Sequence, residues 1–194
     1  MARRGSYAKG VAKREEILER ALEVIAREGY RGASVKEIAD AVGLSQAGLL
    51  HYFDSKEELF VAILRKRDEL DGIRVGADTS LDDARDGFLR VIRHNTEVPG
   101  LVELFSRMAV EAGDPRHPAH AYFRERHAAL RAELLAHAAQ IRTTPPMDPD
   151  SLVRIIQAVA DGLQLQWMLD RDVDMPRIVA DLFDALDARE ERHG

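Results

Sequence analysis

The side chains best suited to chemistry in this sequence of 194 residues are its seven histidines. Four of them have acidic neighbours and could in principle ligate a metal: His94, His117, His120 and His127. His117 and His120 straddle a proline, so they lie at a broken turn and not on one helix face. The sequence has no cysteine, which excludes thiolate zinc sites and cysteine nucleophiles. We therefore expect no metal site and no cofactor.

Several other classes of protein are also disfavoured. The sequence contains no Gly-rich phosphate loop, no nucleophile elbow and no pair of carboxylates distinct from surface charge, so an enzyme is not expected. The charged N-terminus lacks the apolar region of a secretory signal. No apolar stretch reaches the roughly 18 residues that a membrane span requires. We expect a cytoplasmic protein that does not contact a membrane.

The most informative segment is SVKEIADAVGLSQAGLLHYFDSKEEL (34–59). It predicts two short helices joined at Gly43, where the turn needs the left-handed conformation that glycine adopts easily. Ala39 is small enough for the two helices to cross closely. Ser45 begins the second helix and leaves backbone N–H groups that can face a phosphate. This arrangement is typical of a helix-turn-helix.

The charge distribution fits a small nucleic-acid contact surface. The net charge is −6, yet residues 1–14 hold five basic residues and no acidic one. Residues 1–53 carry a net charge of +2 and the remainder a net charge of −8. A basic head on an acidic body suits a DNA-binding domain of limited size. A solvated basic tail explains the same charges equally well.

Amphipathic periods and capping residues predict an all-α protein. Ser34 and Ser55 are each followed by Glu three residues later, which is the capping-box spacing. Residues 72–79 read as a connection and possible hinge, and the prolines of 143–149 require a loop. We expect nine helices and no strand, with these bounds: 12–28, 34–42, 45–52, 55 to the 72–79 connection, 80–96, 99–113, 119–141, 148–169 and 174–189.

The segment from about residue 12 to residue 64 resembles the tetracycline-repressor (TetR) family of bacterial transcriptional regulators. The shared residues occur in family order: Ser34, Ile38, Ala39, Gly43, Leu44, Ser45, Leu49, His51, Tyr52, Phe53, Lys56 and Leu59. The stretch from Ile155 also looks like the C-terminal helices of many members. The resemblance implies a helix-turn-helix domain over 1–54 and a helical ligand-binding and dimerisation domain over 55–194.

The resemblance also implies roles for individual residues. The third helix would lie in the major groove, with Gln46 as the residue able to pair with adenine. Backbone phosphates would be contacted by Tyr52, by Lys56 and by the hydroxyl or amide of Ser34. Two positions depart from the family, which usually has Tyr at Leu50 and often Thr at Gly48. The complete predicted DNA-binding set is Ser34, Ser45, Gln46, Ala47, Gly48, Leu50, His51, Tyr52 and Lys56.

The C-terminal half is expected to dimerise and to bind an effector. The last two helices would pair with their symmetry mates through Ile155, Val159, Gly162, Gln166, Val179, Leu182, Phe183 and Leu186. Their apolar stripes could instead complete the core of one chain. A pocket is predicted among the fifth to eighth helices, lined by Phe88, Ile92, Asn95, Phe105, Met108, Phe123, His127, Gln164 and Trp167.

These expectations combine into one function. The sequence predicts a ligand-responsive regulator that binds palindromic operator DNA as a homodimer and is released from it by a small molecule. Repression is expected because most members of the family that it resembles are repressors. Its partners would be double-stranded DNA, the effector and a second copy of the chain. The alternative is a helical protein-interaction or metal-sensing module that has lost specific DNA binding, a possibility raised by Leu50.

Overall fold

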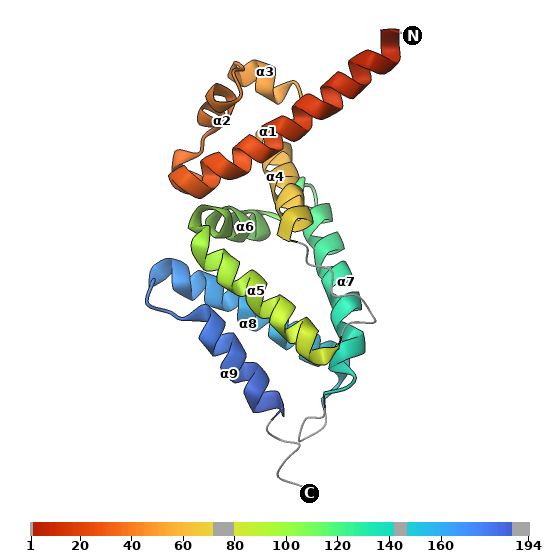
Figure 1. Cartoon of the computed structure of the whole chain (residues 1–194), viewed down its shortest axis with the longest axis vertical. Coiled ribbons are helices and arrows are strands. Elements are labelled where there is room, and N and C mark those ends of the chain that lie inside the picture. Colours follow the sequence, from red (N-terminus) through yellow and green to blue (C-terminus); the bar gives the residue numbers. More distant parts are fainter. Residues whose placement is uncertain (1, 72–79, 142–146, 188–194) are drawn as a thin grey trace, which may run out of the picture. The chain divides into compact units, whose positions relative to one another are not determined.

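The computed structural model of the chain describes residues 2–71, 80–141 and 147–187 (Figure 1). Over these ranges it contains nine α-helices and no strand, as predicted. The helices are α1 Ala2–Gly32, α2 Val35–Ala41, α3 Gln46–Leu50, α4 Lys56–Asp71, α5 Leu81–Glu97, α6 Pro99–Glu111, α7 Ala119–Ala138, α8 Pro149–Leu169 and α9 Met175–Asp187. The predicted hinge at 72–79, most of the 143–149 loop and the predicted helix end at 189 lie outside the described residues.

The helix starts follow the predicted caps. The Ser45 hydroxyl accepts the Gly48 amide at 3.0 Å, and the Ser55 hydroxyl accepts the Glu58 amide at 3.0 Å. The carboxylate of Asp148 accepts the Ser151 amide at 3.0 Å. Each cap satisfies an amide that the first turn of a helix leaves without a partner. None of the helices described is long and apolar enough to cross a membrane.

Some predicted bounds were wrong. The first helix begins at Ala2 and not at residue 12, and it continues through a kink at Gly29, which has φ of 73°. The third helix ends at Leu50, because the following residues form a tight turn with the Tyr52 amide on the Leu49 carbonyl. The seventh helix ends at Ala138 and not at residue 141. Helix ends depend on tertiary contacts, so local sequence determines them weakly.

The chain forms two compact units, each made from two segments. Unit 1 comprises residues 1–71 and 98–123, and unit 2 comprises residues 72–97 and 124–194. Unit 1 therefore holds α1 to α4, α6 and the start of α7, whereas unit 2 holds α5, the rest of α7, α8 and α9. The two compact units do not divide the chain between residues 54 and 55, because α4 and α6 pack with the N-terminal helices. The boundary predicted there, between a DNA-binding domain and a ligand-binding domain, stays a prediction.

Unit 1 is built around α1. Its buried residues Ile17, Ala21 and Ile25 share one core with α2, α3, α4 and α6. Helix α6 crosses α1 closely: a Cβ atom added at Gly100 would lie 2.8 Å from the Cα of Gly29. That close approach fixes α1 against a rigid support, while α2 packs on α1 and α3 packs on α2 (Figure 1).

Unit 2 packs α9 against both α5 and α8 (Figure 1). The rings of Phe88 on α5 and Phe183 on α9 meet edge to face with centroids 5.9 Å apart. The guanidinium of Arg85 forms an ion pair with Asp184, which ties the same two helices together at their surface. A second core of buried residues joins the end of α7 to the first half of α8: Ala138, Leu152, Val153 and Ile156.

Candidate nucleic-acid interface

The turn between α2 and α3 has the geometry that its sequence predicts. Gly43 has φ of 68°, in the left-handed region, and the Leu44 amide donates to the Ala39 carbonyl at 2.9 Å. Ala39 is fully buried at the crossing of the two helices. A larger side chain at Ala39 would separate α2 from α3, and a Cβ at residue 43 would strain the turn.

Helix α3 is anchored on one side and open on the other. Leu49 is completely buried, and Phe53 just beyond the helix is nearly so. Gln46, Ala47 and His51 are exposed. The short helix therefore presents side chains to solvent from a fixed position on unit 1, which is the arrangement that groove insertion requires.

Ser34 has less free hydrogen-bonding capacity than the sequence suggested. Its amide donates to the Glu37 carboxylate at 3.0 Å, and its hydroxyl accepts the Glu37 amide at 3.4 Å. This is the predicted capping box. A phosphate contact from Ser34 would therefore use the hydroxyl hydrogen, because the amide is already engaged.

Tyr52 and Lys56 flank the end of α3. Tyr52 is half-buried against the core of unit 1, and its ring meets that of His51 edge to face at 6.2 Å. Lys56 is exposed at the start of α4, with its ammonium 5.3 Å from the ring centroid of Phe60. A cation at a helix N-terminus is electrostatically unfavourable by itself, so a phosphate neighbour would explain its presence there.

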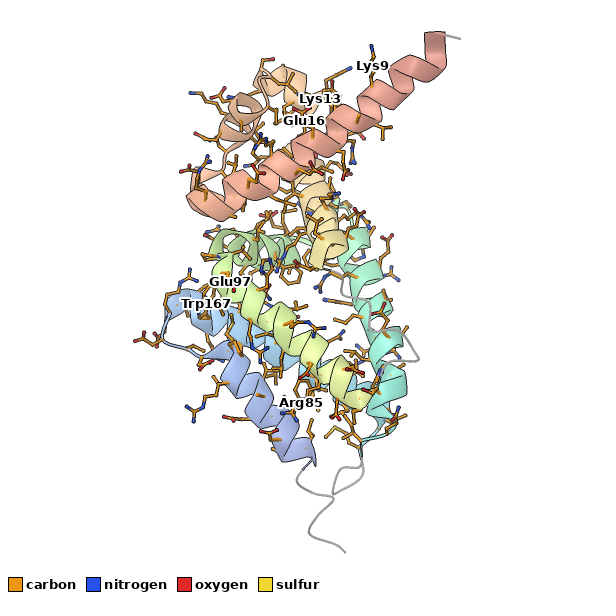
Figure 2. The ribbon with its side chains drawn as sticks, viewed as in Figure 1. Lys9, Lys13, Glu16, Arg85, Glu97 and Trp167 are labelled. Carbon is orange, nitrogen blue, oxygen red and sulfur yellow. The ribbon has the colours of Figure 1, made fainter. Side chains whose placement is uncertain are left out.

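Two basic residues of α1 have structural roles that sequence reasoning missed. The ammonium of Lys13 donates to the Val42 carbonyl at 3.2 Å and to Glu16 at 2.8 Å (Figure 2). The guanidinium of Arg14 lies 4.8 Å from the ring centroid of Phe53. These contacts hold α1 against the ends of α2 and α3. Lys9, one turn earlier, is exposed and remains available to an anion (Figure 2).

The nine predicted ligand-binding residues are divided between the two units. Phe105, Met108 and Phe123 belong to the core of unit 1, where the rings of Phe105 and Phe123 lie 5.0 Å apart. The other six are in unit 2: Phe88, Ile92, Asn95, His127, Gln164 and Trp167. Asn95 and Gln164 are both buried. Asn and Gln side chains are mostly exposed in folded proteins, so these two are unusual.

Unit 2 also contains a pair of interacting ionisable groups that the sequence did not reveal. Burial raises the pKa of Asp161 on α8, and the charge of His127 on α7 partly opposes that shift. Burial lowers the pKa of His127, and the negative charge of Asp161 opposes this in turn. One turn before Asp161, the side-chain nitrogen of Gln157 is buried without a hydrogen-bond partner. Gln157 and Asp161 are thus partly buried polar residues one turn apart on α8.

The predicted dimer residues do not all face outward. Ile155 and Gln166 on α8 are exposed, and Gly162 between them has open space beyond its Cα. Leu165 and Leu169, which were not predicted, extend the same exposed face, and Leu169 is 91% exposed.

The predicted residues of α9 behave differently. Val179 is only 1% exposed within the chain itself, whereas Phe183 and Leu186 pack against the second core. Val159 on α8 and Leu182 on α9 are partly exposed. The outward apolar surface therefore belongs mainly to α8.

Two of the four candidate metal ligands, His117 and His120, lie at the turn between α6 and α7. A ring nitrogen of His120 lies 2.8 Å from the Ala112 carbonyl, and His117 pairs with Glu111 at 3.4 Å. Among the described residues, no three His, Asp or Glu side chains are grouped as metal ligation would require.

The exposed second helix of a capped helix-turn-helix defines a class of DNA-binding domain, and comparison with known proteins gives the family. Residues 17–63 match the family described as bacterial regulatory proteins, tetR family. The repressor AcnR of Corynebacterium efficiens is 36% identical over 91 residues, which cover 47% of this chain and 44% of AcnR. The matched segment is thus less than half of that relative's length. The comparisons therefore support the TetR family for this chain, with the family match lying at residues 17–63.

Solved structures show the same fold over nearly the whole chain. A transcriptional regulator from Rhodococcus sp. Rha1 superposes with a TM-score of 0.67 at 22% identity, covering 89% of this chain and 92% of that one. A regulator from Saccharomonospora viridis, solved in complex with choline, gives 0.66 at 22% identity, covering 88% and 95%. The nine-helix TetR-like architecture predicted from sequence is therefore confirmed.

Proposed function

We propose that this protein is a transcriptional regulator that binds palindromic operator DNA as a homodimer and responds to a small molecule in unit 2. The observation that carries the proposal is the position of α3. Its buried Leu49 fixes the helix on unit 1, while Gln46 and its neighbours remain exposed. A helix held rigidly with a polar exposed face can enter the major groove without reorganisation.

The contacts divide into those that read sequence and those that position the protein. Gln46 is the polar side chain at the start of α3 and can form a paired hydrogen bond with adenine. Tyr52, Lys56 and the Ser34 hydroxyl would contact phosphates, which fixes the register but carries no sequence information. The relative AcnR is named a repressor, which supports repression as the mode of action.

The exposed face of α8 supports the homodimer. Ile155, Gly162 and Leu169 follow one another along this face, and Gly162 would let a second helix approach closely. Operator palindromes are read by two recognition helices, so a dimer is required for the proposed function.

The dimer can be tested by sedimentation. Leu169→Glu should convert the dimer to a monomer at micromolar concentration. Val110→Glu, which adds the same charge at another exposed apolar residue on α6, should leave the dimer intact. Equal behaviour of the two variants would argue against α8 as the interface.

The buried polar groups of unit 2 support an effector site. Asn95 and Gln164 are buried in unit 2, as polar anchors are in small-molecule pockets, and Asp161 is partly buried near the exposed His127. The structurally similar S. viridis regulator was solved with choline. An effector acts only if it binds the DNA-bound and DNA-free states with different affinities.

DNA binding is tested by selection from a pool of random duplexes, followed by fluorescence anisotropy with the enriched sequence. We expect an enriched palindrome and an affinity that falls at least about tenfold between about 50 and 200 mM salt. Tyr52→Ala should weaken binding to selected and random duplexes alike. If no sequence is enriched even at low salt, the chain is instead an interaction module.

A further inference from the structure

Unit 2 contains a cavity whose lining does not include Gln157, Asp161 or His127. It lies between the start of α5, the end of α7, the first half of α8 and α9. The cavity is open to solvent, and its empty space counted together with the solvent at its mouth is about 540 Å³. Phe88 is the one residue it shares with the ligand-binding set predicted from sequence.

The walls of this cavity are almost entirely apolar. Ala84 and Phe88 of α5 face Ala138 of α7, Val153 of α8 and Phe183 of α9. Ala84, Ala138 and Val153 are buried. An apolar void inside a folded unit forfeits dispersion contacts on every wall, so an apolar guest that fills it is stabilised.

The charged groups at the cavity decide which guest fits. Arg85 lines it, but its guanidinium is already paired with Asp184 and lies 5.8 Å from the Phe183 ring centroid (Figure 2). The other charged lining residue is Asp82. Because Asp184 neutralises the charge of Arg85, Asp82 leaves the opening of the cavity with a slight negative charge. An anion would have to displace Asp184 and approach Asp82, so an anionic guest is disfavoured.

A buried cationic guest is disfavoured for a different reason. The walls offer apolar carbon and aromatic rings, and His137 in the lining is engaged with the Glu133 carbonyl at 3.1 Å. Asp82 is exposed, so a cation buried between the apolar walls would lack a charged partner, and burying an unpaired charge is far more expensive than burying a neutral hydroxyl. The charge at the opening and the apolar walls therefore both favour an uncharged guest.

We propose that this cavity is a binding site for a small, uncharged, mainly apolar molecule. The site is separate from the effector site proposed above and does not depend on DNA binding. Phe183 forms one wall and the Arg85–Asp184 pair closes one edge, so an occupant would hold α9 against α5.

The test uses three probes with the same six-carbon chain and different heads: 1-hexanol, hexanoate and hexylammonium. Isothermal titration calorimetry on the full chain should show hexanol binding saturably with one site per chain, and each ionic probe at least tenfold more weakly. From butanol to hexanol, affinity should rise about fourfold for each methylene that is buried. Hexanoate binding as tightly as hexanol would overturn the proposal.

The location is tested by filling the cavity. Ala138→Leu and, as a second variant, Ala84→Leu should each lower hexanol affinity more than tenfold while keeping the helical circular-dichroism signal. Ala128→Leu adds the same atoms at an exposed position of α7 and should bind hexanol as the natural chain does. Unchanged binding in a folded Ala138→Leu or Ala84→Leu variant would exclude this site. The absence of hexanol binding to the natural chain would do the same.

Discussion

Gly100 on α6 lies directly against Gly29 on α1, and residue 100 has no room for a side chain. A Cβ added at residue 100 would lie 2.8 Å from the Cα of Gly29 and would also meet the carbonyl of Ile25. Backbone atoms cannot swing aside as a flexible side chain can. This contact sets how closely α6 packs on α1, the helix against which α2 packs.

Gly100→Ala should therefore destabilise the protein by about 1–3 kcal/mol, the usual range for overpacking a rigid contact. Urea denaturation followed by circular dichroism measures the change in the free energy of unfolding. Gly87→Ala is the matched control, because a Cβ there meets only the end of the Arg90 side chain at 3.6 Å. The control should gain up to about 1 kcal/mol from helix propensity. Two variants of equal stability would contradict the close packing of α6 on α1.

Lys56→Gln should weaken binding to every duplex by a similar factor. A lysine that contacts a phosphate contributes affinity without sequence information, and its loss should reduce the slope of log affinity against log salt by about 1. Anisotropy titrations at several salt concentrations measure both quantities. Arg177→Gln removes the same charge from α9, and its slope should match that of the natural chain. An unchanged slope for Lys56→Gln would remove Lys56 from the interface.

Gln46→Ala should change which sequences are preferred more than how tightly DNA is held. Loss of a paired hydrogen bond with adenine is worth about 1–3 kcal/mol at one base pair and nothing at the others. Repeating the duplex selection with the variant should show relaxed preference at a single symmetric position of the palindrome. If preference is lost at all positions, or at none, Gln46 does not read a base.

The parts of the fold that local chemistry determines could be predicted from sequence. Ser45 and Asp148 cap the helices they were expected to cap, because a cap needs only its own side chain and an amide three residues later. The left-handed turn at Gly43 was predicted for the same reason. The order and number of the described helices followed from these signals together with the apolar periods.

Features that depend on contacts between distant residues could not be predicted. Lys13 reads as part of a basic arm, yet it bonds a carbonyl 29 residues away in sequence. Val179 belongs to an apolar stripe that suits a dimer interface, yet it is buried within one chain. An apolar stripe has the same spacing whether a neighbouring helix or a second subunit covers it. The contacts to DNA, effector and partner subunit stay predictions.

Asp161 gives a prediction for the dependence of stability on pH. Burial raises its pKa above the ordinary value of 3.8, so the folded chain holds this proton more tightly than the unfolded chain. Stability contributed at this site is therefore lost as pH rises through the raised pKa. His127 acts in the opposite direction: its pKa is lowered by burial, so its contribution is lost as pH falls below the ordinary value of 6.5.

Asp161→Asn removes the pH dependence that comes from the raised pKa of Asp161, and it keeps the shape of the side chain. Relative to the natural chain, the variant should become more stable as pH rises from about 4 to about 7, because it no longer buries a carboxylate. Urea denaturation across this range measures the difference, with Asp86→Asn at an exposed site of α5 as the control.

The same variant should lower the pKa of His127 further, because the negative charge that opposes the effect of burial is gone. An NMR titration of the imidazole protons of His127 measures this shift independently of stability. A pKa of His127 that is unchanged or raised in Asp161→Asn would show that the two groups do not interact across α7 and α8. A stability difference that stays constant with pH would show that Asp161 is not desolvated in the folded chain.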